Sequence, residues 1–240
     1  METYWPWGPS VDDFNADRWN DIFVAAGMNF PYRYGINSVL LNEGGRRFLP
    51  SEFVVGVEPR PKGATQKVWF TLHCSGADAF NSMCRACSQQ GATTAGCQLD
   101  SGGRLTMMGA LGTRSAVALD LDADGDLDIV TNEFNANPQV LVADLAQRHG
   151  ISFLKVRLRG TRSNRDGLGS EVTVVLPDGR RILKLLDGKS GYLSQSNLPL
   201  YFGLADADHA AGIEVRWLAG RRQTVAGPIK AGQTIEVVEP

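Results

Sequence analysis

The sequence predicts an all-β protein, and three observations carry this prediction. Many short apolar runs are separated by Gly, Asn, Asp and Pro, the residues that end strands and form turns. The chain has 27 glycines among 240 residues. Its second part alternates apolar and polar residues, which is typical of strands with one buried face.

The strands can be placed from these runs. In the second part, the alternation predicts strands around residues 154–159 and 213–217. In the first part, the apolar runs predict strands at residues 21–26, 38–42, 67–74, 104–111, 127–132 and 139–145.

Turn and helix signals are few. Segment 176–181 predicts a hairpin turn, because Asp178 and Gly179 accept the backbone conformations of a tight reversal. Residues 77–83 and 142–150 predict no more than short helical turns. Neither helix changes the fold class.

Composition indicates a globular protein and excludes two kinds of partner by default. A hydrophobic content of 43% is enough for a sizeable core. The net charge of −2 gives no basic surface for nucleic acid. No window approaches the roughly 18 apolar residues that a membrane span needs, and residues 1–10 lack the features of an export signal.

An internal repeat is visible. An acidic loop, an apolar strand, a polar interval and a second apolar strand follow one another twice. The loops begin at Asp13 and Asp120, too far apart for adjacent copies of a unit of roughly 40 to 60 residues. We therefore expect another strand set or an insertion between them.

The second loop predicts a calcium site. Ca²⁺ takes six to eight oxygen ligands, and alternating carboxylates in a tight loop point at one centre. Gly125 at the sixth position permits the turn, and Asp126 at the seventh is expected to give its backbone carbonyl and leave its carboxylate free. An EF-hand loop has Glu at its twelfth position, where this loop has Thr131. We therefore expect a calcium loop that leads into a strand and is not part of an EF-hand. The predicted ligands are Asp120, Asp122, Asp124, Asp126 and Asp128.

The first loop fits the same pattern less well. Arg18 stands at its sixth position, where a side chain is strained and adds a positive charge. The alternative to a metal site, for both loops, is a solvated acidic turn. The predicted ligands of the first loop are Asp13, Asn15, Asp17, Asp21 and the carbonyl of Trp19.

The two acidic loops resemble FG-GAP (VCBS-type) repeats, the calcium-loop blades of β-propellers. Segments "SNRDGLGSEVTVVLPDGR", "GKSGYLSQSNLPLYFGLADAD" and "GIEVRWLAGRRQTVAG" resemble the ASPIC/UnbV domain of the cartilage acidic protein family. The motif positions are Asn164, Asp166, Gly167, Gly169, Gly191, Tyr192, Ser194, Gln195, Ser196 and Gly203.

This resemblance implies a domain organisation. Residues 1–150 would form partial propeller blades with a Cys-containing insertion at about 72–103, and residues 151–240 a small β-sandwich or barrel-like domain. Since a propeller typically closes with four to eight blades, the chain resembles the C-terminal portion of a longer protein that carries the missing blades. The resemblance also implies an extracellular, periplasmic or cell-surface location.

The cysteines lie in the expected insertion. Cys74, Cys84, Cys87 and Cys97 allow three disulfide pairings, and the sequence does not choose among them. In an exported protein the simplest pairing joins Cys74 to Cys84 and Cys87 to Cys97. A zinc site is the rival, although the run has only one close cysteine pair.

We expect a calcium-binding, non-enzymatic binding or scaffold module that recognises a protein or a glycan. Tyr192, Ser194, Gln195 and Ser196 could form a binding surface, although glycine-rich turns with a buried Tyr also make the corners of small β-folds. No G-x-S-x-G or Walker motif is present. The alternative is a calcium-dependent enzyme or accessory protein that cyclises or tailors a small-molecule natural product.

Overall fold

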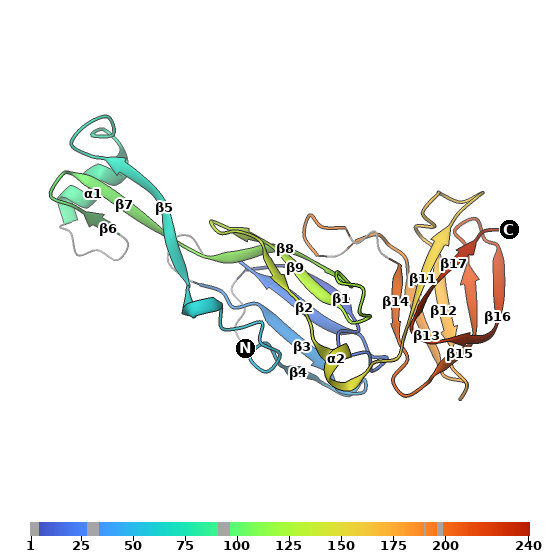
Figure 1. Ribbon diagram of the computed structural model, residues 1–240. Helices are drawn as coiled ribbons and strands as arrows, with labels where there is room; N and C mark the ends of the chain where they lie inside the picture. Colours follow the sequence, from blue (N-terminus) through green and yellow to red (C-terminus); the bar gives the residue numbers. More distant parts are fainter. Residues whose placement is uncertain (1–4, 28–33, 91–96, 190, 196–198) are drawn as a thin grey trace.

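The computed structural model describes residues 5–27, 34–90, 97–189, 191–195 and 199–240. The described strands form five sheets, none of them closed. Figure 1 shows three parts: two N-terminal sheets in the middle, an arm that extends away from them, and a C-terminal sandwich on the other side. The prediction of an all-β protein is confirmed.

The N-terminal sheets are two antiparallel meanders that follow chain order. The first sheet consists of β1 (Pro6–Asp12), β2 (Asp21–Ala26), β3 (Ser38–Asn42) and β4 (Phe48–Pro50). The second consists of β8 (Gly112–Leu119), β9 (Asp128–Phe134) and β10 (Gln139–Leu141). Their shared core is small, because it consists of Phe23, Ala25, Val39, Val57, Ala116 and Ile129.

A buried polar network also joins these two sheets. The Arg60 guanidinium pairs with Glu133 of β9 (N···O 2.6 Å), and both side chains are almost fully buried. Thr113 of β8 donates to Glu133, while Arg60 Nε donates to Tyr34, whose hydroxyl lies 2.8 Å from Glu58. Buried ionic groups need such partners, because an unpaired buried charge is strongly destabilising.

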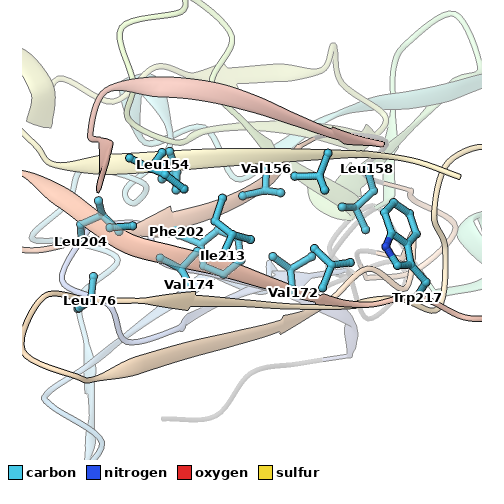
Figure 2. Close-up of a cluster of buried hydrophobic side chains, with 14 residues drawn as sticks. Leu154, Val156, Leu158, Val172, Val174, Leu176, Phe202, Leu204, Ile213 and Trp217 are labelled. Atoms are coloured by element: carbon cyan, nitrogen blue, oxygen red, sulfur yellow. The ribbon is translucent and has the colours of Figure 1, made fainter. Parts of the chain in front are cut away.

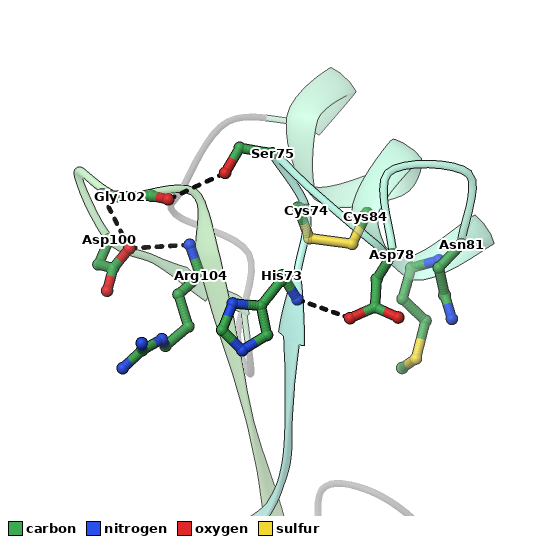
Figure 3. The surroundings of a disulfide bond; sticks show 10 residues. His73, Cys74, Ser75, Asp78, Asn81, Cys84, Asp100, Gly102 and Arg104 are labelled. Carbon is green, nitrogen blue, oxygen red and sulfur yellow. Dashed lines mark hydrogen bonds between the residues drawn. A yellow bond between two sulfur atoms is a disulfide. The ribbon is translucent and has the colours of Figure 1, made fainter.

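The arm interrupts the chain between β4 and β8. It contains the 3₁₀ turn Pro61–Gly63, β5 (Gln66–His73), α1 (Ser82–Gln90), β6 (Cys97–Leu99) and β7 (Arg104–Ala110), in a sheet of order β5-β7-β6. The Cys74–Cys84 disulfide lies directly after β5 (Figure 3), and Cys87 is also disulfide-bonded. The Cys97 side chain lies outside the described residues, so the pairing predicted for it stays a prediction. The arm is longer than the expected insertion at 72–103.

The C-terminal sandwich, defined as β11–β17, contains the largest core. One sheet has the order β14-β11-β17, with β11 parallel to β17, and the other has the order β13-β12-β15-β16. Apolar side chains of both sheets meet between them, with Trp217 at one end (Figure 2). The strands are β11 (Phe153–Arg159), β12 (Glu171–Val175), β13 (Arg181–Leu185), β14 (Leu200–Gly203), β15 (His209–Arg216), β16 (Arg222–Lys230) and β17 (Gln233–Val238).

Most expected elements are present, with shifted ends. The hairpin at 176–181 joins β12 to β13 as predicted. The short helix α2 (Leu145–His149) ends before Gly150, as expected, whereas α1 begins at Ser82, near the end of the predicted turn at 77–83. The run at 139–145 is a strand only over β10, because its last residues lead into α2.

Candidate metal centre

The two acidic loops occupy equivalent places in the two N-terminal sheets. Residues 13–20 join β1 to β2, and residues 120–127 join β8 to β9. The fourth and sixth positions of both loops have left-handed backbones: Ala16 and Arg18 have φ of 57° and 85°, and Ala123 and Gly125 have φ of 65° and 107°. The predicted repeat is therefore a repeat of conformation as well as of sequence.

The ninth residue of the first loop joins two segments of its sheet. Asp21 Oδ2 accepts a hydrogen bond from the Phe14 N–H (2.9 Å), and Asp21 Oδ1 accepts one from the Asn42 N–H at the end of β3 (2.7 Å). Burial raises the pKa of Asp21 to about 6, although these two N–H groups lower it. The side chain thus ties the loop to the neighbouring strand.

The ninth residue of the second loop repeats this arrangement. Asp128 Oδ2 accepts from the Leu121 N–H (2.7 Å), and Asp128 Oδ1 accepts from the Ala143 N–H just after β10 (2.8 Å). The side chain is fully buried. Both aspartates that were predicted as ligands at this position therefore also brace the loop against its sheet.

Three carboxylates of the second loop meet. Oxygen atoms of Asp120, Asp122 and Asp124 all lie within 4.8 Å of one another. The Asp120 side chain is only 3% exposed, and its Oδ1 atom is buried without a hydrogen-bond partner. Its Oδ2 atom contacts the Lys155 ammonium of β11. A buried carboxylate oxygen without a donor is costly, and hard oxygen ligands of this kind suit Ca²⁺.

Asp126 behaves differently from the expectation. Its carboxylate is buried instead of free: Oδ2 accepts from the Ala146 N–H in the first turn of α2 (2.9 Å), and Oδ1 has no hydrogen-bond partner. Burial raises the pKa of this carboxyl. Asp124 closes the loop, since its Oδ1 accepts from the Asp126 N–H (3.1 Å) and its Oδ2 from Gln147 Nε2 (2.5 Å). The residues of the second loop therefore fit a cation.

The first loop lacks such an open oxygen. Asp13 Oδ1 accepts from the Asp17 N–H (2.9 Å), and Asp13 Oδ2 accepts from the Arg18 N–H (2.8 Å). Burial raises the pKa of Asp13 to about 7, although the Arg18 N–H and Lys184 lower it. Asp17 is occupied by the Asn15 amide (3.1 Å) and by the Trp19 N–H (2.8 Å). The polar groups of this loop therefore satisfy one another.

The first loop docks on β14 of the C-terminal sandwich. The Ala205 N–H donates to the carbonyl of Ala16 (3.0 Å). A Cβ atom at Gly203 would lie 2.1 Å from Asp13 Oδ2 and 2.6 Å from the Ala16 backbone. Only glycine allows this approach, so Gly203 of the "FGL" segment makes room for the buried Asp13 carboxylate. A second tie is an ion pair between Lys184 of β13 and Asp12 of β1 (2.5 Å).

The second loop docks on the neighbouring strand, β11. The Phe153 ring covers Gly125, where a Cβ atom would lie 2.1 Å from it, and it stacks on Tyr201 of β14 (centroids 5.8 Å apart). Lys155 lies two residues further along the same face and contacts Asp120. Both acidic loops therefore face one sheet of the sandwich, a contact that no periodicity in the sequence indicated.

Comparison with known proteins finds a family match for the last third of the chain. Residues 160–240 match the family model described as ASPIC and UnbV. This segment is therefore similar to ASPIC and UnbV domains. It supplies β12 to β17, which is most of the C-terminal sandwich.

Two curated relatives are similar to the chain, both named Cartilage acidic protein 1. The protein from Homo sapiens is 31% identical over 124 residues, which cover 51% of this chain and 18% of that protein. The protein from Mus musculus is 32% identical over 106 residues, covering 44% of this chain and 16% of that protein. The matched part thus spans less than a fifth of either relative.

The residues predicted as a possible binding surface lie beside β1. Tyr192 is 42% exposed, and its ring lies 5.1 Å from that of Trp7 between centroids. The Ser194 hydroxyl is buried without a hydrogen-bond partner, Gln195 is exposed, and Ser196 lies outside the described residues. These residues border the N-terminal sheets.

Among the remaining motif positions, some have a local structural role. The Asn164 side chain both accepts from and donates to the backbone of Leu168 (2.7 Å each), and Gly167 and Gly169 have positive φ. Asp166 lines a smaller pocket beside β11.

A cleft lies between the N-terminal sheets and the sandwich. Its volume is about 850 Å³, and its wall includes Asp12, Asp120, Lys155, Lys184, Arg157 and Tyr192. The two aspartates in this set are paired with the two lysines. None of the described helices is long and apolar enough to cross a membrane.

Proposed function

We propose that the chain is part of a calcium-binding, non-enzymatic module of extracellular type that recognises a protein or glycan. The observation that carries the calcium proposal is the buried Asp120 Oδ1 atom, which has no hydrogen-bond donor and lies beside two further carboxylates. A divalent cation there would offset the cost of burying that charge. The first loop, whose carboxylate oxygens already accept hydrogen bonds, is proposed as the weaker site.

The proposed context is a partial β-propeller of FG-GAP type. The two N-terminal meanders would be two of its blades, because each has an acidic loop between its first and second strands and the same bracing aspartate. Blades that are open on one side leave strand edges to be covered, so we propose that further blades belong to the natural protein.

The extracellular location rests on two supports. A disulfide between Cys74 and Cys84 persists in oxidising compartments. The similar relatives carry a cartilage protein's name. We propose that the cleft between the sheets and the sandwich is where the partner binds, since ligand sites favour concave junctions of this kind.

The calcium proposal is tested by thermal unfolding with and without a chelator. Saturating Ca²⁺ at about 100 times its Kd stabilises the native state by about 2.7 kcal/mol. At about 2–4 °C per kcal/mol, the Tm should rise by several degrees and return in excess chelator.

Two variants sharpen this test. Asp120→Asn should abolish the calcium-dependent rise, because it removes the carboxylate with the open oxygen. Asp178→Asn should keep it, because Asp178 pairs with Arg180 on an exposed turn. If the Tm of the unmodified chain is the same with Ca²⁺ and with chelator, the calcium proposal is refuted.

The enzyme alternative has one supporting feature, the cleft. Acid–base chemistry would need a buried carboxylate there that is free to exchange protons. Asp12 and Asp120 are held by lysines, and the third carboxylate in the cleft wall, Asp187, is exposed and accepts a hydrogen bond from the Lys189 N–H. The geometry therefore supports binding better than catalysis.

A further inference from the structure

The Lys155 ammonium, which belongs to the C-terminal sandwich, contacts the Asp120 carboxylate of the candidate metal centre. Its side chain is 16% exposed and contacts Asp120 Oδ2, while Asp120 Oδ1 stays without a donor. The ammonium also lies 5.0 Å from the centroid of the Phe153 ring, which itself covers Gly125 of the same loop. Lys155 therefore reaches the loop from a fixed position on β11.

We propose that Lys155 is a built-in competitor of the metal ion, so that calcium binding to the 120–128 loop breaks the Lys155–Asp120 ion pair. This inference rests on the proposed calcium site and adds its regulation. The sandwich would compete with the ion for Asp120, and the ion would loosen one of the ties that hold the sandwich on the N-terminal sheets.

The competition follows from charge and from the length of the lysine side chain. A divalent cation and an ammonium bound to one carboxylate repel each other strongly at a separation of a few ångströms, because the partly buried site screens them poorly. Lysine is a point charge on a flexible stem, so it can leave while the backbone of β11 stays in place. The adjacent cleft gives the released ammonium access to solvent.

The second ion pair between the two parts provides an internal reference. Lys184 pairs with Asp12, which lies in β1 before the first loop and outside the 120–128 loop. The Lys184 side chain is 10% exposed, which is similar to the exposure of the Lys155 side chain. Calcium at Asp120 should leave this pair intact, so the sandwich stays attached while one contact is exchanged.

The first experiment is calorimetric titration of Ca²⁺ into the full chain and two variants. Lys155→Met removes the competitor and should tighten calcium binding by about tenfold, the effect of one lost opposing charge near the site. Arg157→Met is the matched control: Arg157 lies on the same face of β11, lines the same cleft and forms no ion pair with a described residue. It should change the affinity by less than about twofold.

The second experiment needs no variant. Lysines of the unmodified chain are acetylated with a limiting reagent, with and without Ca²⁺, and each site is quantified by mass spectrometry. Labelling of Lys155 should rise severalfold with calcium, while labelling of Lys184 stays constant. If Lys155→Met fails to fold, as judged by circular dichroism, this measurement decides.

The outcomes separate the two proposals. Equal calcium affinity in all three proteins, with unchanged Lys155 labelling, would overturn the competition and leave the calcium site standing. Calcium binding that appears only in Lys155→Met would support the competition strongly. No binding in any of the three proteins would overturn both proposals.

Discussion

Residues of one type have different roles in these loops, and their surroundings decide which. In Asp21 and in Asp128, each of the two carboxylate oxygens accepts a hydrogen bond from a backbone N–H, and the two N–H groups belong to separate segments. Asp13 is closed off by its own loop, whereas Asp120 keeps one buried oxygen without a donor. The same residue type therefore holds a loop against its sheet at some positions and is a candidate metal ligand at another.

Glu239 is another carboxylate whose role comes from backbone donors. Its Oε2 atom accepts hydrogen bonds from three consecutive N–H groups, those of Thr161 (2.9 Å), Arg162 (2.8 Å) and Ser163 (2.7 Å). Burial alone would raise the pKa of Glu239, but these hydrogen bonds outweigh it and lower the pKa to about 2.

This shift predicts a pH dependence of stability. Because the pKa is lower in the folded state than its ordinary value of 4.5, the ionised side chain stabilises the fold above that pH. The stabilisation is lost as the pH falls from about 4.5 to about 2. Glu239→Gln should lower the Tm at neutral pH and flatten its fall in acid. Glu236→Gln, which removes an exposed ion pair with Arg159, should not; equal effects of the two variants would contradict this prediction.

At the scale of elements, two neighbouring strands of one sheet receive the two acidic loops. In the β11–β14 ladder, Lys155 pairs with Tyr201 and Phe153 pairs with Gly203. Gly203 admits the Asp13 carboxylate, and Phe153 covers Gly125. Both docking contacts are therefore set by strand register, so a change at one ladder position should disturb a loop that is far away in the sequence.

Gly203→Ala tests this docking. The added methyl group would overlap Asp13 Oδ2 and the Ala16 backbone, so we expect a loss of about 1–3 kcal/mol in the free energy of unfolding. Gly76→Ala is the control, since its Cβ atom would lie 3.8 Å from the nearest atom, the His73 carbonyl oxygen. Urea unfolding of both variants measures the difference. A Gly203→Ala protein as stable as the unmodified chain would show that the contact is not tight.

At the scale of the whole molecule, the parts differ in how they are held together. Among the described residues, the sandwich core is formed by side chains between Leu154 and Val237. The N-terminal sheets share a small apolar core and depend on the buried Arg60–Glu133 pair. The arm has its own small cluster around the Cys74–Cys84 disulfide. The sandwich is therefore the part most able to fold by itself.

We expect residues 151–240, produced alone, to unfold cooperatively in calorimetry. Their Tm should not respond to Ca²⁺ or chelator, because both acidic loops lie outside this segment. It should be lower than the Tm of the same part in the full chain, since the isolated segment exposes Phe153, which packs against Gly125 of the second loop. Noncooperative melting would show that the sandwich needs the N-terminal sheets.

The fold class and much of the repeat followed from the sequence, because they depend on local order. Apolar runs and turn residues placed β2, β3 and the β12–β13 hairpin. The spacing of carboxylates indicated a metal loop at Asp120, and Arg18 marked the weaker loop. The sequence does not predict β1 and β8, because glycine, proline or polar residues interrupt the alternation of apolar and polar residues in these strands.

What only the tertiary structure decided concerns contacts between distant segments. No pattern in the sequence pairs Lys155 with Asp120, Lys184 with Asp12, or Arg60 with Glu133. The sequence determined which residues could bind a cation, because ligand type and spacing are local properties. Tertiary packing determined which carboxylate oxygens, those of Asp120 and Asp126, are left without a donor, because that depends on which backbone amides and lysines the fold brings to them.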